Sequence, residues 1–172
     1  MGEDFEGWYV RNHGAVLSSL TLIAGDQDAA REATDEAFAR AFERWARVGV
    51  MASSSGWVYR TALNVLKRRG RRASMERRLL GRIETGELHV PATWSIEIVD
   101  AMRLLPMRER IAITLRYVAD LSTDQIAEAM SIAPGTVGST LHSGRQHLAS
   151  LLGEPQPSHT VVELEEVRDA NP

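Results

Sequence analysis

The 172-residue sequence contains no cysteine and no apolar run near the roughly 20 residues that a membrane helix needs. The lack of cysteine excludes disulfides and thiolate metal sites, and the five histidines are scattered without metal-ligand spacing. The N-terminal Met1–Asp4 segment is acidic where a secretory signal is basic, and no apolar stretch follows it. We therefore expect a cytoplasmic protein that needs no metal or cofactor and does not enter a membrane.

Signals of catalysis are missing as well. The sequence has no glycine-rich phosphate loop, no nucleophile with a nearby base, and no carboxylate pair set apart from helix-face charges. We therefore expect no enzymatic activity and no catalytic residues.

The net charge is only −3 at pH 7, but the charges are unevenly distributed. Residues 56–82 hold nine basic side chains and one acid, Glu76, whereas residues 1–50 hold nine acidic and five basic ones. Residues 83–128 are again acidic, with eight acids to four bases. A basic band between acidic segments is expected where one face meets phosphate and other faces meet different partners.

Strand signals are absent too, because no alternating stretch of β-branched residues is long enough. Apolar residues recur instead at helical spacings of three and four, in Phe5–Leu22, Ala29–Trp45, Trp57–Leu66, Ile98–Val118, Ser122–Met130 and Thr136–Leu152. Turn formers mark breaks, among them Gly25-Asp26 and Pro106. The pattern predicts an all-α fold of two small helical domains: an N-terminal domain at 1–82, a linker at 83–95, a helix-turn-helix domain at 96–152 and a disordered acidic tail at 153–172.

The helix-turn-helix prediction rests on residues 121–148. Ser122 and Gln125 fit a capping box, and Ala127 is small enough for a second helix to approach closely. A turn follows, and Pro134 opens the next helix at a position that tolerates a missing amide. In such a motif the second helix enters the major groove. An ordinary helical hairpin that binds no nucleic acid fits the same pattern.

The preceding helix makes the similarity more specific. The residues concerned are Leu105-Pro106 with Arg108 and Arg110, Leu115-Arg116-Tyr117, Leu121-Ser122, Ile126-Ala127-Glu128, Gly135-Thr136-Val137 with Ser139, and Leu141-His142. Together they resemble the C-terminal, −35-binding domain of the extracytoplasmic-function (ECF) group of bacterial sigma factors. Helix-turn-helix regulators of the two-component type share part of this pattern.

The recognition helix departs from the family in its charge. The family usually has basic residues where this chain has Gly138, Thr140 and Ser143, and Arg145 alone remains. Each lost phosphate contact removes roughly 0.9 from the salt slope of duplex binding. The resemblance implies a weak or unusual −35 contact, made by Thr136, Ser139, Thr140, His142, Ser143 and Arg145. The alternative is that this domain chiefly docks on polymerase.

A loop of small residues precedes the basic band. Ser53, Ser54, Ser55 and Gly56 lead into a helix with an apolar stripe and a basic end at 67–72. Cations can follow phosphates, and a polar loop can hold an unstacked base, so the arrangement suits melted DNA. Basic clusters are otherwise often solvated surface or localisation tags.

This segment resembles the family's −10-reading helix through Trp57, Tyr59, Arg60, Ala62 and Asn64, although Leu63 replaces a usual basic residue. The resemblance implies that the serine loop lines a pocket for a flipped base of the non-template strand. It further implies that the strand is held by Arg60, Asn64, Lys67 and Arg68, with Arg69, Arg71 and Arg72 at the basic end. Trp57 fits either a stacking platform or a core residue.

The helix at 28–45 has a charged outer face, which alone indicates only a solvated surface. It is similar to the family's helix that binds the polymerase clamp, through Glu32, Asp35, Glu36 and Phe38. Ala33 stands where a larger aliphatic residue is usual, and Asp35 where glutamine is common.

The resemblance covers most of the chain and implies a dissociable sigma subunit. Its expected partners are core RNA polymerase and promoter DNA, as −35 duplex and melted −10 non-template strand. An anti-sigma factor is a further expected partner, because the family commonly has one. Two alternatives stay open: a helix-turn-helix regulator that acts without polymerase, and a sigma-like interaction module with weakened promoter reading.

Overall fold

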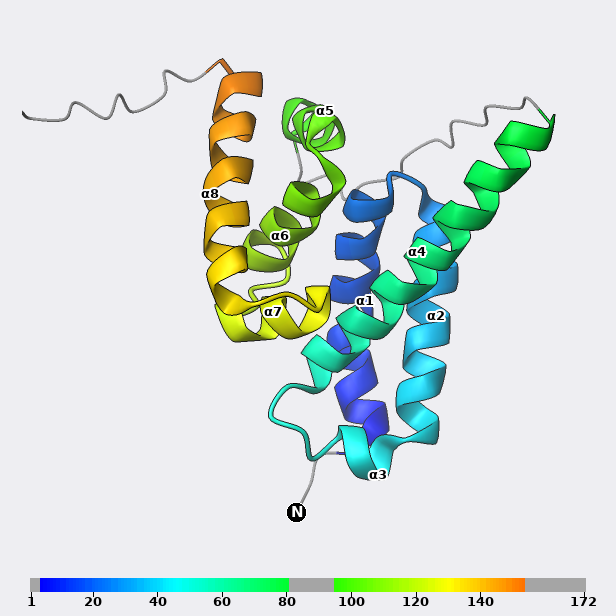
Figure 1. The fold of residues 1–172 in the computed structure, drawn as a ribbon. Coiled ribbons are helices and arrows are strands. Elements are labelled where there is room, and N and C mark those ends of the chain that lie inside the picture. Colours follow the sequence, from blue (N-terminus) through cyan, green and yellow to red (C-terminus); the bar gives the residue numbers. More distant parts are fainter. Residues whose placement is uncertain (1–3, 81–94, 154–172) are drawn as a thin grey trace, which may run out of the picture.

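The computed structural model describes residues 4–80 and 95–153, and all the regular elements in these ranges are helices (Figure 1). They are α1 (Phe5–Ala24), α2 (Gln27–Glu43), α3 (Trp45–Val48), α4 (Ser54–Leu80), α5 (Ile96–Leu104), α6 (Met107–Tyr117), α7 (Thr123–Met130) and α8 (Pro134–Leu151). The predicted all-α fold class is confirmed. Most of the predicted linker and nearly all of the predicted tail lie outside the described residues.

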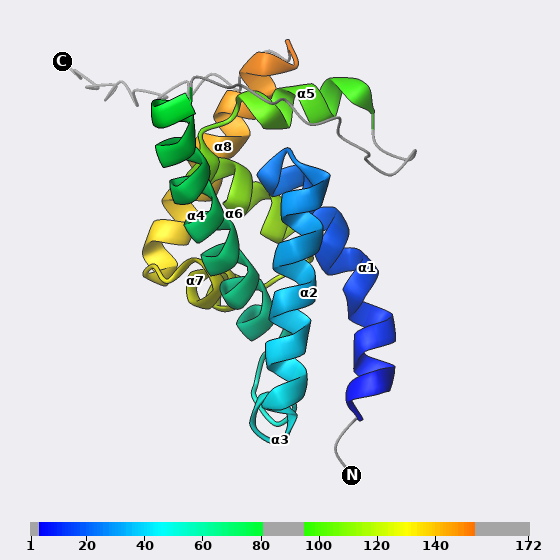
Figure 2. The same cartoon turned by 90° about the vertical axis from the view of Figure 1, so that its right-hand side faces the viewer.

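The turn between α1 and α2 follows from two adjacent residues. Gly25 ends α1 with φ 67°, a left-handed conformation that glycine adopts without steric cost. Asp26 caps α2, accepting a hydrogen bond of 2.9 Å from the backbone N–H of Ala29. The two helices therefore fold back on each other and lie side by side in both views (Figures 1 and 2).

A row of alanines allows α2 to pack closely against both α1 and α4. Its fully buried members are Ala30, Ala33, Ala37 and Ala41. Phe38 continues this stripe into an aromatic cluster, with its ring centroid 5.3 Å from that of Trp8 and 5.1 Å from that of Tyr9. The core is thus formed by the face of this helix that lies opposite its charged outer face.

Helix α4 extends well beyond the predicted stretch that ends at Leu66. The apolar periodicity stops there because residues 67–72 leave the core, but arginine, glutamate, methionine and leucine keep the chain helical to Leu80. The described part of the basic band, residues 56–80, therefore lies on one continuous helix, which crosses the front of the molecule in Figure 1.

The second half contains the predicted helix-turn-helix. The apolar segment at 98–118 is divided at Leu105-Pro106 into α5 and α6, as the proline indicates. The capping box of α7 is present: the backbone N–H of Ser122 donates to Gln125 Oε1 at 2.8 Å, and that of Gln125 donates to Ser122 Oγ at 3.3 Å. Gly144 lets α8 pack closely on α6, since an added Cβ would lie 2.9 Å from Ile113 Cγ1.

The two halves pack against each other. Helix α7 lies on α4, and α6 and α5 lie on α1, so that buried apolar residues of both halves form one continuous core. Arg110 fastens this junction, donating to the carbonyl of Ile23 at 3.3 Å and to those of Arg103 and Leu105 at 2.6 and 3.1 Å. Burial, with a smaller contribution from Arg103, lowers the pKa of the Arg110 guanidinium. Within the described ranges, the helices are all too short or too polar to cross a membrane.

Candidate nucleic-acid interface

The serine loop is held by its own hydroxyl groups. Ser53 Oγ accepts a 2.9 Å hydrogen bond from the backbone N–H of Gly56, and Ser54 Oγ donates to the carbonyl of Val48 at 2.9 Å. Ser55 Oγ lies 3.4 Å from Asn12 Oδ1. Gly56 is required by this arrangement, since an added Cβ would lie 2.7 Å from Ser53 Oγ. Ser54, Ser55 and Gly56 form the first turn of α4, so of the predicted serine loop only Ser53 lies before the helix, and the four residues together make the polar N-terminal end of α4.

Trp57, at the first turn of α4, belongs to the core. Its side chain is only 7% exposed, and the neighbouring Val58 and Tyr59 are also buried. The tyrosine hydroxyl lies 3.1 Å from Ser19 Oγ, and burial raises the pKa of Tyr59 to about 12. Of the two roles predicted for Trp57, the structure favours the core residue.

Beside the loop, α2, α3 and α4 border a half-open cavity of about 240 Å³, half of whose lining residues are arginines. Its lining residues are Arg40, Arg44, Arg47, Val48, Trp57, Arg60, Thr61 and Asn64. Arg44 and Arg47 are exposed and form no ion pair with any described residue. The cavity therefore gathers guanidinium groups from three helices at one place, next to the polar Asn64.

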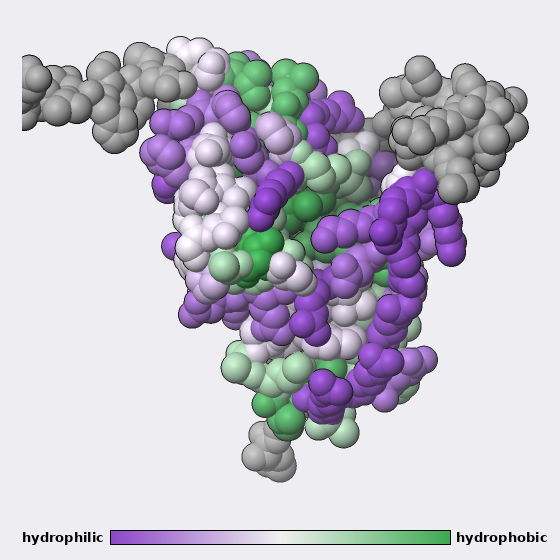
Figure 3. Space-filling model, viewed as in Figure 1, coloured by the Kyte–Doolittle hydropathy of each residue, from purple (hydrophilic) through white to green (hydrophobic). Residues whose placement is uncertain are grey.

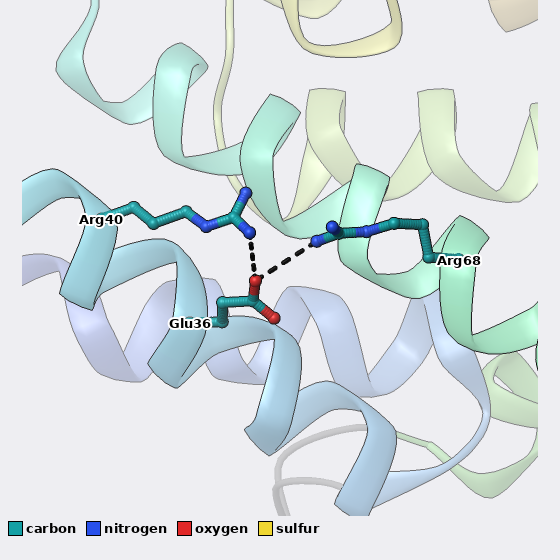
Figure 4. Close-up of polar contacts among 3 residues, drawn as sticks. All are labelled: Glu36, Arg40 and Arg68. Atoms are coloured by element: carbon teal, nitrogen blue, oxygen red, sulfur yellow. Dashed lines mark hydrogen bonds and ion pairs between the residues drawn. The ribbon is translucent and has the colours of Figure 1, made fainter.

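Two ion-paired contacts join the acidic face of α2 to the basic part of α4. Glu36 Oε1 accepts from Arg40 on its own helix and from Arg68 on α4, the latter at 3.2 Å (Figure 4). Glu32 pairs with Arg69 in the same way. Side chains predicted to contact polymerase thus neutralise side chains predicted to contact DNA.

The remaining cations of the basic end point outward. Lys67, Arg71 and Arg72 are exposed, and none of them forms an ion pair within the described part of the chain. Hydrophilic side chains accordingly cover the right-hand side of the molecule over α4 and α2 (Figure 3).

The four residues predicted to contact polymerase have different surroundings. Glu32 and Asp35 are exposed and Glu36 is partly exposed, whereas Phe38 is 2% exposed and lies among aromatic rings. Asp35 lies 3.6 Å from His13 Nε2 of α1. The acids can therefore meet a partner directly, while Phe38 can act only by supporting the helix.

The recognition helix α8 presents a thinly charged surface. Ser139, His142 and Arg145 are exposed, and the Arg145 guanidinium donates to the Tyr117 hydroxyl at 3.3 Å. Thr136 and Ser143 are half-buried. Thr140 is buried, and its hydroxyl donates to the carbonyl of Thr136 at 2.7 Å. Thr140 therefore does not share the outward face with Ser139 and His142.

Comparison with known proteins places this geometry in a family. The family model described as "Sigma-70, region 4" matches residues 95–148. The ECF RNA polymerase sigma factor SigL of Mycobacterium tuberculosis is 31% identical over 152 residues, covering 83% of this chain and 85% of SigL. The chain belongs to the ECF family of RNA polymerase sigma factors.

Another relative extends the similarity over nearly the whole of this sigma factor. The RNA polymerase sigma-E factor of Streptomyces coelicolor is 26% identical over 176 residues, covering 96% of this chain and 97% of that protein. Among solved structures, the sigma factor RpoE of Bartonella quintana, in complex with the anti-sigma factor NepR, has the same fold. Its TM-score is 0.78 at 19% identity, covering 87% of this chain and 97% of that one.

Family membership confirms the predicted class of function. A sigma factor is a non-enzymatic subunit that binds core RNA polymerase and promoter DNA to start transcription. A regulator that acts without polymerase is thereby set aside.

Part of this sigma factor's basic surface was missed by the sequence analysis. The band at 56–82 drew attention to α4, while Arg40, Arg44 and Arg47 lay in a segment that is acidic overall. Their spacing of four and three is a signal that the sequence does contain, although the structure places Arg40 on α2, Arg44 between the two helices and Arg47 on α3. Their meeting with Arg60 depends on how α2 and α3 pack against α4, and spacing alone does not reveal this.

Proposed function

We propose that this sigma factor divides promoter recognition between its two halves. The half at 1–82 binds core polymerase through Glu32, Asp35 and Glu36, and holds the melted −10 non-template strand along α4. The half at 96–152 meets the −35 duplex through the exposed face of α8. The site of action is the cytoplasm, where polymerase and DNA meet.

The observation that carries this proposal is the arginine-lined cavity beside the serine loop. A single strand needs cations along its phosphates and a polar recess for an unstacked base. The cavity supplies Arg44, Arg47 and Arg60, and the loop begins five residues after Val48 in its lining. We assign the strand path to this cavity, the serine loop and the outward cations Lys67, Arg71 and Arg72.

Two of the residues first assigned to contacts act indirectly in this proposal. Phe38 holds the clamp-facing helix through its aromatic neighbours, and Thr140 supports α8 through its hydrogen bond to Thr136. The −35 contact is left to Ser139, His142 and Arg145, with Thr136 and Ser143 at its edge. Because this face carries one positive charge, its contact with the −35 duplex adds little to the affinity for promoter DNA.

An anti-sigma factor is part of the same proposal. The RpoE protein that shares this fold was solved with the anti-sigma factor NepR bound. We infer that this sigma factor is likewise held by a protein inhibitor until it is needed.

The test is promoter-dependent transcription with purified components. The full chain is mixed with core polymerase and a promoter library, and run-off transcripts are mapped. Transcripts that require both protein and core support the proposal. Core binding without promoter opening would instead indicate an interaction module that no longer reads promoters.

A matched pair of variants tests the strand assignment. Arg44→Ala with Arg47→Ala should lower open-complex formation and reduce the salt slope of single-strand binding by about 1.4, roughly 0.7 for each lost phosphate contact. Core binding should be unchanged. Arg103→Ala with Arg108→Ala removes the same charge from the second half as a control. Equal losses in the two double variants would contradict the assignment.

A further inference from the structure

Lysine is almost absent from this sigma factor. Of its 20 basic side chains, all but Lys67 are arginines. The two side chains differ chemically, because a lysine amine can lose a proton and attack an acyl group, whereas a guanidinium keeps its proton and its charge in proteins. A reagent that acylates side-chain amines therefore has one target among the 172 residues, and that target lies on α4.

Lys67 lies on the outward stripe of α4. Arg60, Asn64, Lys67 and Arg71 follow one another at spacings of four, three and four, which places them on one helical face. Arg60 and Asn64 line the arginine-lined cavity, so the stripe continues from that cavity towards the basic end of the helix. Lys67 is therefore in the middle of the strand path assigned above.

The next two arginines are engaged with α2 instead. Arg68 pairs with Glu36. Arg69 pairs with Glu32, and all four side chains border a second cavity of about 200 Å³ between α2 and α4. Lys67 does not line that cavity; it is exposed and forms no ion pair with the residues that the structure describes. Its amine is thus open to a reagent from solvent.

The surroundings of Lys67 suit an acyl donor that is itself an anion. Arg71 lies one helical turn further along the stripe and is also exposed, and Arg60 lies two turns before Lys67. Clustered positive charge raises the local concentration of anions. An acyl phosphate carries its reactive carbonyl next to a phosphate group, so a guanidinium can bind the phosphate while the carbonyl meets the amine.

We propose that Lys67 is an acylation site through which an acyl phosphate weakens the hold of this sigma factor on the −10 strand. The Lys67 ammonium gives one proton to water, and its nitrogen attacks the carbonyl carbon of the donor. The bond from that carbon to the phosphate oxygen breaks, and the departing phosphate takes up the second proton that the nitrogen loses. The product is a neutral amide, so the strand path loses one positive charge. The inference rests on the proposed strand path.

The modification acts on one function of the molecule. The proposed polymerase contacts on α2 are acidic, and the exposed face of α8 carries an arginine and no lysine. Loss of the charge at position 67 therefore weakens the contact with the strand and leaves the binding of core polymerase as it was.

The first experiment measures the reactivity of the amine. The full chain is incubated with acetyl phosphate, and peptide mass spectrometry follows acetylation at Lys67 separately from the N-terminal amine. We expect Lys67 to react at least about threefold faster than the side chain of N-acetyl-lysine amide, and at least about twofold more slowly in Arg71→Gln than in the parent. Arg108→Gln, which removes an exposed charge from α6, should leave the rate unchanged. A rate no faster than that of the free amino acid, or one that Arg71→Gln does not lower, would overturn the proposed site.

The second experiment measures the effect on the strand. The chain acetylated at Lys67 should bind a fluorescent, mixed-sequence single-stranded oligonucleotide about two- to fivefold more weakly at low salt than the untreated chain, with a salt slope smaller by about 0.7. Binding of core polymerase should be the same before and after treatment. Lys67→Arg is treated in parallel, and the treatment should not change its affinity, because a guanidinium keeps its charge.

The outcomes separate this inference from the function on which it rests. If acetylation at Lys67 leaves the salt slope unchanged while Arg44→Ala with Arg47→Ala lowers it, the strand path holds and the acylation site is overturned. If treatment weakens Lys67→Arg as much as the parent, the effect comes from another amine, and the inference is again overturned. If the untreated chain does not bind single strands, the strand assignment itself fails and takes the inference with it.

Discussion

The Arg68 guanidinium of α4 lies 3.2 Å from the Glu36 carboxylate of α2, joining a cation assigned to DNA to an acid assigned to polymerase. The same carboxylate accepts from Arg40, so one acid pairs with two arginines, Arg68 of the basic end and Arg40 of the cavity lining (Figure 4). In the free sigma factor the two binding surfaces are therefore electrostatically coupled.

Glu36→Gln should release both arginines for phosphate. We expect single-strand affinity to rise about two- to fivefold at low salt, with the gain fading as salt screens the charges. The pair is partly exposed, so the free energy of unfolding should change by less than about 1 kcal/mol. Fluorescence anisotropy over a salt series measures the affinity. Asp35→Asn removes the same charge beside His13 rather than beside α4, and an equal gain there would contradict the coupling.

Gly144→Ala and Gly138→Ala should have opposite effects on stability, although they make the same substitution on the same helix. An alanine Cβ at 144 would lie 2.9 Å from Cγ1 of the stiff, buried Ile113, whereas nothing lies within 4 Å at 138. Overpacking costs about 1–3 kcal/mol and the gain in helix propensity is about 1 kcal/mol. Urea unfolding should therefore show a loss of about 1 kcal/mol for Gly144→Ala and a gain of up to about 1 kcal/mol for Gly138→Ala. Equal stabilisation of both would mean that α6 and α8 are not tightly packed.

Local signals predicted the helices because those signals act within a few residues. Ser122 and Gln125 are three positions apart, and Pro106 divides two helices by its own backbone chemistry. The contacts that shape the candidate site are of another kind. Gln125 meets Ser53 from 72 positions away, and only the packing of α7 on α4 brings them together.

A polar residue beside an apolar stripe was harder to place from the sequence. Val137, Leu141 and Leu148 mark the inner face of α8, and Thr140 lies next to that stripe, but its hydroxyl also suits a surface that contacts DNA. The structure turns Thr140 inward, and its hydroxyl is satisfied by the preceding turn. The sequence did not decide between two roles for Trp57 for a related reason. An aromatic residue at the start of a DNA-binding helix can either pack in the protein core or stack on a base.

Alkaline pH should weaken the fold through Tyr59. Burial raises its pKa to about 12 from the ordinary value of 10, so the folded state keeps the phenol neutral while the unfolded chain loses its proton. The unfolded state then binds fewer protons, and stability falls as pH rises from about 10 to about 12, by up to roughly 2–3 kcal/mol. Urea unfolding across this range, with phenolate absorbance recorded in parallel, measures the loss.

Tyr59→Phe should remove this part of the alkaline loss. It should also cost about 1–3 kcal/mol at neutral pH, because the buried Ser19 hydroxyl loses its partner at 3.1 Å. Tyr9→Phe, at a more exposed ring, is the matched control. The same alkaline slope in the parent and in Tyr59→Phe would show that other groups cause it.

Arg145→Ala decides whether α8 contacts DNA or chiefly docks on polymerase. Arg145 carries the one positive charge of the exposed α8 face among the described residues, and the Tyr117 hydroxyl steadies its guanidinium. If the face meets duplex phosphate, Arg145→Ala should lower the log–log salt slope of duplex binding by up to about 0.9. Tyr117→Phe should weaken binding less, because the charge remains.

Arg103→Ala is the control for charge. In the parent chain the Arg103 guanidinium lies 3.6 Å from Asp100 on α5. If Arg145→Ala changes the slope no more than Arg103→Ala while polymerase binding falls, α8 serves docking, and promoter choice rests on the −10 surface of α4.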